Sequence, residues 1–512
     1  MIGLAEWLRR RVARGPRRPA LTCDEETWSY GELQDRVERL SAVLANGGVG
    51  TGDRVGYLGF NHPIFLVALF ATARIGAIFV PLNFRLTGPE LEFVIGDAGV
   101  HTLLVGAEHL DIISSIKPVL SCRRYLAVAP VSAGWESAEV AMLAALSQPP
   151  MDVDPDSVAA IIYTSGTTGN PKGAMLTHGN FWANNVNTHL VFDCVSTDVV
   201  LNNAPLFHVG GLCVITMPAL AAGGHVILQR AFDPLSALQA IEKYRITVSF
   251  AVPAMLLFMS QHEAFERADL SSLRLIAVGG APMPESLLRL YNGRGIPVHQ
   301  GYGMTETTTM IAFLSPDLSA EKLGSCGNAP ILTEFMIWDY SGDPITQPHV
   351  KGEVCVRGAN VMKGYWNRPD ATAAVLDEQG WFRSGDIGYV DEEGYLYLCD
   401  RLKDMVISGG ENVYPAEVES ALFGHPAIAE IAVIGSADER WGERVVAVVA
   451  LKPGASLTLE ELRTYGDGRL ARYKLPRQLR LVAALPRNPT GKVLKNTLRE
   501  AMPNESAPTL QR

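Results

Sequence analysis

One stretch of this chain limits its fold more than any other. The apolar residues Val158 to Tyr163 are followed at once by hydroxyl side chains and glycines, and then by a lysine. An apolar run that ends in a turn predicts a buried strand. The glycines let backbone N–H groups approach a ligand closely, and successive N–H groups, with the hydroxyls and the ammonium group, suit a polyphosphate. The residues expected to hold the phosphates are Thr164, Ser165, Gly166, Thr167, Thr168, Gly169 and Lys172.

Other phosphate and catalytic motifs do not fit. The Walker A spacing fails because the position five after Gly166 is Pro171. No G-x-G-x-x-G follows a predicted strand, no H-E-x-x-H occurs, and Ser165 lacks the G-x-S-x-G frame. A nicotinamide fold, a zinc protease and a serine hydrolase are therefore not supported. Local composition alone leaves one alternative, an ordinary surface turn rich in serine, threonine and glycine.

Length and composition indicate a large globular protein of the cytoplasm. A chain of 512 residues predicts two or more domains, and 47% hydrophobic residues can build a sizeable core. The net charge of −10 argues against a general nucleic-acid binder. The seven cysteines include no C-x-x-C pair, which is typical of free thiols in a reducing compartment. We expect a monomer or a homodimer.

Neither end of the chain nor its most apolar stretch predicts a membrane span. Residues 1–18 mix arginines with apolar residues and indicate an amphipathic helix, not a signal peptide. Residues 63–82 are apolar for nearly twenty positions, but Arg74 and Gly76 interrupt them. We interpret this stretch as a buried helix to about Ala73 followed by a strand. A peripheral contact with a membrane stays open.

The first three hundred residues alternate helical and strand patterns. This alternation predicts parallel sheets with helices on both faces. Residues 133–155 are rich in Ala, Ser, Pro and Asp and are expected to form a connection. Helices are expected at 30–46, 63–73, 87–97, 178–188, 211–222, 234–244, 253–260 and 284–291. Strands are expected at 20–22, 27–30, 54–59, 77–80, 103–105, 125–128, 199–202, 224–228, 248–251, 275–278 and 297–300.

The pattern changes after residue 325. Short strands between Gly, Asp and Pro turns predict an antiparallel, barrel-like subdomain over 325–400. The fold class is therefore an α/β protein of several subdomains. Its large N-terminal body, residues 1–402, would hold two doubly wound sheets and the β-barrel-like subdomain. Residues 403–512 would form a small mobile C-terminal α+β domain.

Four further motifs follow the phosphate turn in order. They are Gly301-Tyr302-Gly303-Met304-Thr305-Glu306, Trp381-Phe382-Arg383-Ser384-Gly385-Asp386, Asp400-Arg401-Leu402-Lys403-Asp404 and Pro489-Thr490-Gly491-Lys492. With the phosphate turn, they make the chain resemble the adenylate-forming enzymes, the superfamily of acyl-CoA synthetases, luciferases and peptide-synthetase adenylation domains. The resemblance covers nearly the whole chain and is closest to bacterial fatty acyl-CoA synthetases.

The resemblance implies an ATP-dependent ligase that uses magnesium. A carboxylate attacks the α-phosphorus of ATP, pyrophosphate leaves, and the acyl-adenylate then forms the CoA thioester with release of AMP. Glu306 supplies the kind of carboxylate that magnesium binds beside phosphate oxygens and water. The resemblance adds Thr164 as a second metal contact and Thr305 as a contact to the α-phosphate.

The adenosine is expected to contact residues from several motifs. Asp386 follows a Ser-Gly turn and can accept hydrogen bonds from both ribose hydroxyls. The resemblance adds Arg401 as a second ribose contact, and it more often has threonine where this chain has Ser384. Tyr302 is expected to stack on adenine. The remaining residues expected around the nucleotide are Val209, Gly280, Ala281, Pro282, Gln300, Gly301 and Gly303.

Three side chains have roles that only the resemblance implies. Lys492 would bridge the substrate carboxylate and the phosphate during adenylation, so the small domain must close over the site. Lys403 aligns with the hinge about which that domain swings. His208 matches a histidine at the mouth of the acyl pocket, where it would contact the carboxylate or act as a gate. The expected catalytic set is Lys492, Thr305, Glu306 and His208.

The acid is expected to be hydrophobic. The segments expected to line its pocket are 208–212, 249–252, 278–281 and 304–309, which are mainly apolar and small, and their glycines leave room for a tunnel. Amino-acid-activating relatives place an aspartate where this chain has His208. This chain therefore has no carboxylate at that position to pair with the ammonium of an amino acid, which argues against an amino acid substrate. A medium- to long-chain fatty acid is favoured, with an aryl acid as the alternative. A ligase that loads a carrier protein, and a degenerate binding protein without activity, are the other interpretations considered.

Overall fold

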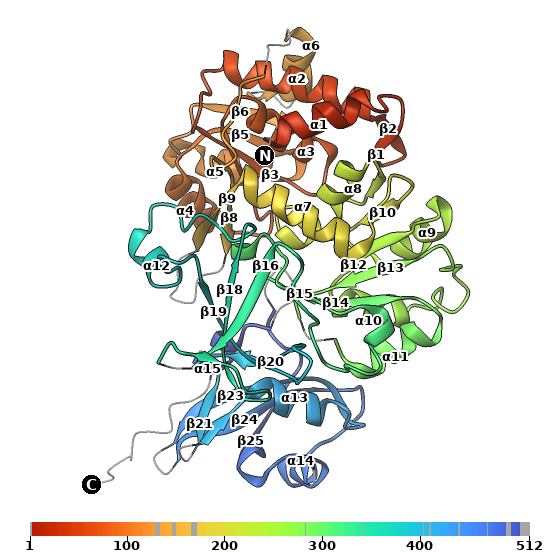
Figure 1. Ribbon diagram of the computed structural model, residues 1–512, viewed down its shortest axis with the longest axis vertical. Coiled ribbons are helices and arrows are strands. Elements are labelled where there is room, and N and C mark those ends of the chain that lie inside the picture. The colour runs from red at the N-terminus through yellow and green to blue at the C-terminus, as the bar shows by residue number, and fades with distance from the viewer. Residues whose placement is uncertain are drawn as a thin grey trace. The chain divides into compact units, whose positions relative to one another are not determined.

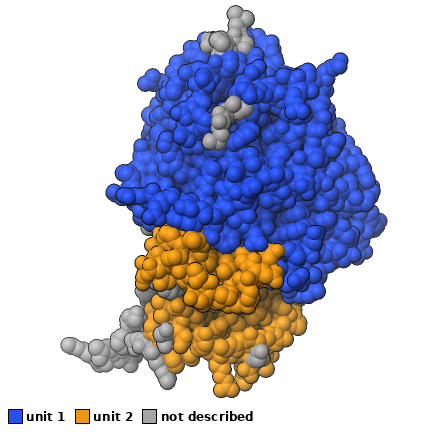
Figure 2. Space-filling view, viewed as in Figure 1, with its two compact units in different colours: residues 1–335, 356–382 blue, residues 336–355, 383–512 orange. Residues whose placement is uncertain are grey.

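The computed structural model describes residues 3–128, 134–145, 150–164, 171–281, 283–339, 341–402, 404–408, 411–438, 441–467, 469–487 and 493–501. The chain divides into two compact units (Figure 2). The first comprises Met1–Phe335 and Val356–Phe382, and the second comprises Met336–Cys355 and Arg383–Arg512. Lys403, where the sequence predicts the domain boundary, lies outside the described residues, so that boundary stays a prediction.

A seven-stranded sheet contains the strand that leads into the phosphate turn (Figure 1). Its neighbouring strands pair in parallel, except for the antiparallel pair at the β9 edge. In order across the sheet, the strands are β7 (Glu136–Ser137), β6 (Arg124–Val128), β5 (Val100–Gly106), β3 (Arg54–Leu58), β4 (Ile78–Leu82), β8 (Val158–Thr164) and β9 (Lys172–Thr177).

Helices cover both faces of this sheet, as the alternating pattern predicts. On one face, Val80 of β4 joins a cluster with Leu91 of α4 and Leu110 of α5. On the other face, Phe79 of β4 meets Phe65 of α3 with ring centroids 4.9 Å apart. The helices are α1 (Leu4–Ala13), α2 (Tyr30–Asn46), α3 (Pro63–Arg74), α4 (Gly88–Ala98), α5 (Leu110–Ile116) and α6 (Ala138–Ala144). The short β7 and α6 lie in the region for which only a connection was predicted.

The most apolar stretch of the sequence is a core helix. All twelve residues of α3 are buried, including Arg74 at its end, which lies 3.4 Å from the carboxylate of Glu38. A helix that is buried on every side within the protein accounts for this apolar run, so no membrane span is needed to explain it. Among the described residues, no helix is long and apolar enough to cross a bilayer.

The second sheet has eight strands and takes its outer pair from the start of the chain. The strands expected at 20–22 and 27–30 form the antiparallel pair β1 and β2, and β1 pairs in parallel with β11 of this sheet. In order, the strands are β15 (Ala312–Phe313), β14 (Val298–Tyr302), β13 (Leu275–Val278), β12 (Val248–Ala251), β10 (Val199–Asn202), β11 (His225–Leu228), β1 (Pro19–Cys23) and β2 (Glu26–Ser29).

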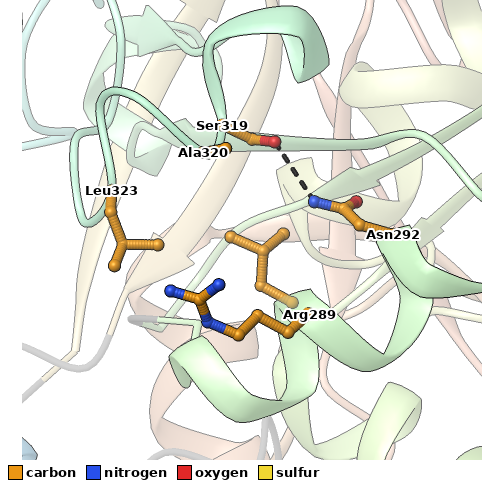
Figure 3. A pocket seen from close by; sticks show the side chains of 6 residues that line it. Arg289, Asn292, Ser319, Ala320 and Leu323 are labelled. Atoms are coloured by element: carbon orange, nitrogen blue, oxygen red, sulfur yellow. Dashed lines mark hydrogen bonds between the residues drawn. The ribbon is translucent and has the colours of Figure 1, made fainter.

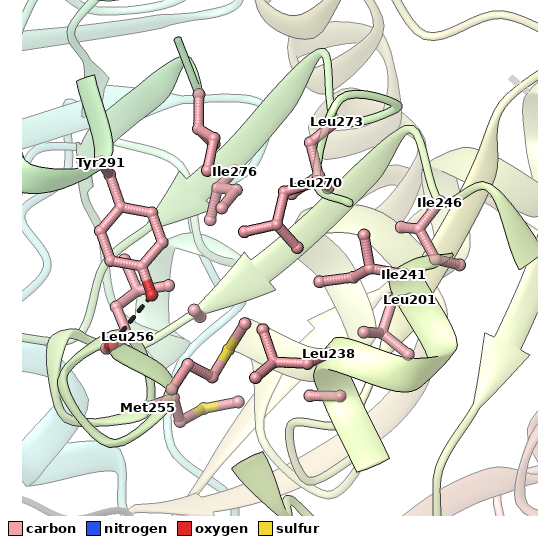
Figure 4. Close-up of a cluster of buried hydrophobic side chains, with 14 of the residues drawn as sticks. Leu201, Leu238, Ile241, Ile246, Met255, Leu256, Leu270, Leu273, Ile276 and Tyr291 are labelled. Atoms are coloured by element: carbon pink, nitrogen blue, oxygen red, sulfur yellow. Dashed lines mark hydrogen bonds between the residues drawn. The ribbon is translucent and has the colours of Figure 1, made fainter. Parts of the chain in front are cut away.

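A compact hydrophobic cluster supports the second sheet from one side (Figure 4). Leu238 and Ile241 of α9 and Leu256 of α10 pack with Ile276 of β13. Tyr291 of α11 is fully buried, and its hydroxyl donates to the carbonyl of Leu256 at 2.8 Å. The helices of this region are α7 (His178–Phe192), α8 (Met217–Ala222), α9 (Pro234–Tyr244), α10 (Pro253–Gln261) and α11 (Glu285–Gly293).

The helix predicted at 211–222 has two parts. Residues Gly210–Thr216 form a π-helical turn, and only α8 after it is α-helical. The hydroxyl of Thr216 donates to the carbonyl of Gly211 at 2.7 Å. Pro218 has no N–H to close a regular turn onto Val214, so a wider turn precedes it.

The barrel-like subdomain predicted at 325–400 is an open sheet. Its five strands run in the order β17-β16-β18-β19-β20, without closure among the described residues. They are β16 (Thr333–Trp338), β17 (Pro344–Ile345), β18 (Gly352–Gly358), β19 (Phe382–Val390) and β20 (Leu396–Arg401), and the short α12 (Pro369–Ala373) lies between β18 and β19 in sequence.

The last hundred residues form the α+β arrangement that the sequence predicts. The sheet runs in the order β22-β21-β24-β23, with β25 beside β24. Val433, Val445 and Val449 of its strands share one buried cluster with Leu422 and Leu462 of the helices. The elements are β21 (Val406–Ser408), β22 (Glu411–Val413), α13 (Pro415–Phe423), β23 (Ile428–Asp438), β24 (Gly442–Leu451), α14 (Leu459–Gly466), β25 (Gln478–Val482) and α15 (Lys495–Glu500).

Candidate functional site

The phosphate turn connects the antiparallel strands β8 and β9. Thr164 and Lys172 stand opposite each other in the register of this pair, and the Thr164 hydroxyl donates to the carbonyl of Lys172 at 3.4 Å. The strands therefore place the first and last predicted phosphate contacts side by side. The predicted contacts between them, Ser165, Gly166, Thr167, Thr168 and Gly169, lie outside the described residues.

Glu306 lies in a tight turn directly after β14. The chain folds back so closely that a Cβ on Gly303 would lie 1.2 Å from the carbonyl oxygen of Thr309. Thr308 and Thr309 both adopt positive φ values, 49° and 94°. Such a conformation is strained for a β-branched residue, at roughly 1–3 kcal/mol each, and persists only where the surroundings enforce it.

Asn360 is the residue that enforces this turn. Its side chain is fully buried, and its amide donates to the carbonyls of Thr307 and Met310, both at 2.7 Å. Its side-chain oxygen accepts from the Thr333 hydroxyl at 2.7 Å, and its backbone carbonyl accepts from the Thr308 hydroxyl at 2.8 Å. Sequence reasoning missed Asn360, because nothing in the local run around it marks an asparagine as buried.

A single tyrosine connects the Glu306 turn to the phosphate turn. The hydroxyl of Tyr365 donates to Oε1 of Glu306 at 2.9 Å, and Nζ of Lys172 lies 5.3 Å from the centre of its ring. Burial, reinforced by the charge of Glu306, raises the pKa of Tyr365 well above its usual range. The phenol therefore stays protonated and donates. Lys172 and Glu306, predicted from two separate motifs, thus both contact a residue that was not predicted. Thr164 lies opposite Lys172 in the strand pair.

The backbone holds this tyrosine in place. The segment 362–366 runs along β9: the Met175 N–H donates to Gly364 at 2.9 Å, and the Trp366 N–H donates to Gly173 at 2.8 Å. The Met362 N–H donates to the carbonyl of Glu306 itself at 2.7 Å. The segment between β18 and α12 therefore binds both the phosphate strand and the metal-ligand candidate.

Asp97 holds the end of β8, the strand that leads into the phosphate turn. Its carboxylate accepts from the hydroxyl of Tyr163, one residue before Thr164, at 2.7 Å and from Arg368 at 2.5 Å. Its backbone carbonyl accepts from the indole of Trp366 at 3.2 Å. One largely buried carboxylate thus ties the end of β8 to the segment that carries Tyr365.

The adenine side of the site is built from neighbouring strands. Val278 of β13 pairs with Gln300 of β14, so Gly280 and Ala281 leave the sheet beside Gly301 and Tyr302. Gly280 has a φ of +82°, which glycine adopts without strain. Tyr302 is buried. Pro282 lies outside the described residues.

His208 lies between β10 and the π-helical turn, next to Val209. Its ring is 4.3 Å from that of Phe207, which in turn meets Phe84 edge to face at 5.2 Å. Burial, followed by the positive charge of Arg85, lowers the pKa of His208 to about 4. Its Nε2 is buried and has no hydrogen-bond partner among the described residues. A neutral imidazole with an unpaired nitrogen is ready to contact a substrate oxygen.

Three of the four segments predicted to line the acyl pocket, 208–212, 249–252 and 278–281, meet at Phe250, and they pack more closely than their glycines suggested. The ring of Phe250 on β12 lies 3.0 Å from where a Cβ on Gly210 would be and 3.9 Å from that of Gly279. A Cβ on Gly211 would lie 2.5 Å from the carbonyl oxygen of Pro205. A phenylalanine and a backbone carbonyl therefore lie directly against glycines that we expected to leave open space.

The ribose candidates belong to the second unit. Asp386 on β19 and Arg401 on β20 are paired in register. The turn before Asp386 is held by buried Glu353, which accepts from the N–H of Gly385 at 3.0 Å and from Arg383 at 2.5 Å. The predicted hinge Lys403 and the predicted closing residue Lys492 lie outside the described residues, so both roles stay predictions.

A measurable cavity elsewhere is not the predicted acyl pocket. It has a volume of about 270 Å³ and lies between α11 and the segment 319–323 (Figure 3). Leu288 and Leu323 line it, and Asn292 donates to Ser319 at 3.2 Å on its wall. None of these residues belongs to a predicted motif.

The residues at the turn fit a magnesium ion held largely by a nucleotide. Thr164 offers a hydroxyl oxygen and Glu306 a carboxylate, which are the hard donors that magnesium binds. Within the described ranges, no three carboxylate, histidine or cysteine side chains gather as a complete protein site. Phosphate oxygens and water would therefore supply the remaining ligands.

The sheets, the phosphate turn and the Glu306 turn define an adenylate-forming enzyme. The chain belongs to the AMP-binding enzyme family: residues 8–366 match this family, and residues 417–492 match the AMP-binding enzyme C-terminal domain. This agrees with the resemblance drawn from the motifs.

Relatives within the family cover almost the whole chain. It is 45% identical over 498 residues to a feruloyl-CoA synthase of Amycolatopsis, covering 97% of this chain and 98% of the relative. It is 43% identical over 499 residues to an indoleacetate–CoA ligase of Aromatoleum aromaticum, at 97% and 98% coverage. It is 38% identical over 507 residues to the long-chain-fatty-acid–CoA ligase FadD13 of Mycobacterium tuberculosis, at 98% coverage of each.

A solved structure shares the arrangement as well. The o-succinylbenzoate CoA synthetase of Bacillus subtilis in complex with ATP and magnesium superposes with a TM-score of 0.86. The two chains are 35% identical, and the match covers 96% of this chain and 98% of the other.

Proposed function

We propose that this protein is an AMP-forming CoA ligase whose substrate is an aromatic carboxylic acid. The observation that carries the ligase assignment is the cluster of Lys172, Tyr365 and Glu306, which joins a phosphate turn to a carboxylate suited to magnesium. The family match and the CoA ligases among its relatives support it.

The predicted site residues have distinct tasks in adenylation. Lys172 and the phosphate turn bind the β- and γ-phosphates, so that pyrophosphate leaves with its charge compensated. Thr305 contacts the α-phosphate, and Asp386 and Arg401 hold the ribose. Glu306 and Thr164 would hold magnesium, which would neutralise charge on the phosphate oxygens. The acid carboxylate is oriented beside His208, whose neutral ring does not compete with Lys492 for it.

The closing lysine serves the first half-reaction of this scheme. Lys492 would contact the carboxylate and the α-phosphate during adenylation and withdraw when the small domain rotates about Lys403. The thiol of CoA then attacks the acyl carbonyl and AMP leaves. This division of labour rests on the resemblance alone.

The structure favours an aromatic acid over a long alkyl chain. Phe250 lies beside Gly210 and Gly279, where segments expected to line the acyl pocket meet, and offers an aromatic ring there for stacking. Two of the relatives, at 45% and 43% identity, are named for aromatic acids, ferulate and indoleacetate. The sequence alone favours a fatty acid.

A medium- to long-chain fatty acid is the second candidate. The relative FadD13, 38% identical over nearly the full length, is named for long-chain fatty acids.

A panel of acids separates the candidates. Purified protein is mixed with ATP, magnesium and CoA, and AMP and thioester are measured with ferulate, indoleacetate, benzoate and straight-chain acids from C6 to C20. We expect kcat/KM to be highest for an aromatic acid. Higher values for C12 to C18 acids would favour the second candidate. Absence of AMP with every acid would overturn the ligase assignment, and thioester formation only on a holo carrier protein would replace CoA as the acceptor.

A further inference from the structure

Tyr365 contacts both charged groups of the proposed nucleotide site. Its hydroxyl binds Oε1 of Glu306 at 2.9 Å, and its ring lies under the ammonium of Lys172 at 5.3 Å. Its exposed fraction is 8%, so these two contacts are largely shielded from water. Tyr365 belongs to no predicted motif, and the nucleotide chemistry described above does not use it.

The two charges contact the same side chain instead of each other. Within the part of the chain that the structure describes, Lys172 and Glu306 form no ion pair with each other, although both contact Tyr365. A direct pair between them would satisfy the lysine meant for phosphate and occupy the carboxylate meant for magnesium. In a partly buried site such a pair would be held tightly, since salt screens it little.

The tyrosine prevents this by its shape and its hydroxyl. The ring lies 5.3 Å from the ammonium of Lys172 while its hydroxyl binds Glu306. An ammonium over an aromatic face is attracted without losing its charge. The hydroxyl binds one oxygen of Glu306, which fixes the plane of the carboxylate. Backbone bonds on both sides of the segment, to Glu306 and to β9, keep the ring at this position.

We propose that Tyr365 is a positioning residue that holds Glu306 and Lys172 apart and orients both for magnesium and polyphosphate before the nucleotide arrives. The proposal rests on the role of Glu306 as a magnesium ligand. It predicts that the hydroxyl and the ring act separately: the hydroxyl serves the metal, and the ring serves the phosphate lysine.

Nucleotide binding, measured without turnover, tests this. ATP affinity is measured by calorimetry on the full-length protein without acid or CoA, once with EDTA and once with magnesium. The ratio of the two dissociation constants gives the tightening due to the metal. Three variants are compared with the wild type: Tyr365→Phe, Tyr365→Ala and Glu306→Gln.

The variants separate the two parts of the proposal. Tyr365→Phe keeps the ring, so its ATP dissociation constant in EDTA should stay within about twofold of the wild-type value. The tightening by magnesium should fall about tenfold, which is the typical contribution of a hydrogen bond to a charged group. Tyr365→Ala should lose the tightening and also weaken ATP binding in EDTA about tenfold, because Lys172 is then able to pair with Glu306. An unchanged tightening in Tyr365→Phe would overturn the proposal.

Tyr163→Phe is the matched control. Tyr163 is also a partly buried phenol that donates to a carboxylate, Asp97, at 2.7 Å, and it lies one residue from the phosphate turn. We expect its loss to lower the melting temperature and leave the tightening by magnesium unchanged. Equal loss of tightening in this variant would show that any disturbance of the region has the same effect, which would overturn a specific role for Tyr365.

The Glu306→Gln variant distinguishes failure of this proposal from failure of its premise. If magnesium still tightens ATP binding to this variant, the assigned role of Glu306 is wrong. If the tightening disappears there but persists in Tyr365→Phe, the metal role stands and only the positioning role of Tyr365 falls.

Discussion

Replacing Asn360 should disable the site more than it destabilises the fold. Three side-chain hydrogen bonds of this fully buried residue would be lost, two to the carbonyls of Thr307 and Met310 and one from Thr333. At about 1 kcal/mol for each bond, Asn360→Ala should lower the free energy of unfolding by about 3 kcal/mol. Without these bonds, Thr308 and Thr309 can leave their strained conformations, which each cost roughly 1–3 kcal/mol.

The relaxed turn would move Glu306 from its position. A displacement of about 1 Å in a catalytic arrangement can cost about 100-fold in rate. We therefore expect pyrophosphate release with a good acid substrate to fall about 100-fold in Asn360→Ala, measured well below its melting temperature.

Asn180→Ala provides a matched control. Asn180 also donates two bonds, to the carbonyls of Ala359 and Val361 at 2.9 and 2.8 Å, and accepts one from the N–H of Thr177. Asn180→Ala thus also removes three hydrogen bonds, two of them to the residues before and after Asn360. Asn180 makes none of these bonds to the Glu306 turn. Urea unfolding should show a similar loss of stability for both variants. Equal loss of activity in both, or full activity in Asn360→Ala, would refute the reasoning.

Three further predictions follow from the site and the buried histidines. Phe250→Ala should lengthen the pocket, and kcat/KM should rise by about fourfold for each added methylene that fits, from about 0.8 kcal/mol per CH₂; a flat profile from C6 to C12 would contradict the assigned place of Phe250. Lys492→Ala should abolish adenylation but spare thioester formation from supplied acyl-adenylate, and equal loss of both steps would refute its role. Burial lowers the pKa of His178 and of His299 from 6.5 to about 4, so each stays neutral in the folded protein while the unfolded chain takes up a proton. The contribution of these histidines to the free energy of unfolding should therefore be fully present above pH 6.5. It should fall by up to about 1.4 kcal/mol per pH unit for each histidine toward pH 4. Urea midpoints that do not change over this range would contradict this prediction.

Elements set by local pattern were predictable from the sequence. The helix Tyr30–Asn46 was predicted with its observed bounds, because its apolar stripe is a local signal. The structure adds the capping box of Ser29 and Glu32 at its start. The strand into the phosphate turn and the turn after β14 were also found from apolar runs and glycine spacing. The predicted residues Thr164 and Lys172 lie opposite each other at adjoining strand ends, and Lys172 and Glu306 both contact Tyr365.

Contacts between distant segments were not predictable in this way. The hairpin β1–β2 precedes the first sheet in the chain but joins the second, since pairing with β11 is decided by which edge is open. The open five-stranded sheet was expected to be barrel-like, because short strands between turns look the same in either arrangement. The space beside Gly210 was expected to be open, and only the packed structure shows Phe250 against it.

The sequence by itself determined the family, the sheets and the chemical groups of the nucleotide site, because glycines, hydroxyls and charges at fixed spacing leave a local signal. The tertiary structure alone decided what holds those groups in position. Asn360 and Tyr365 lie more than fifty residues after Glu306, and their side chains become partners of its turn only when the chain folds back along β9. A buried hydrogen bond between distant segments leaves no pattern in the local sequence, because the two partners come together only in the folded protein.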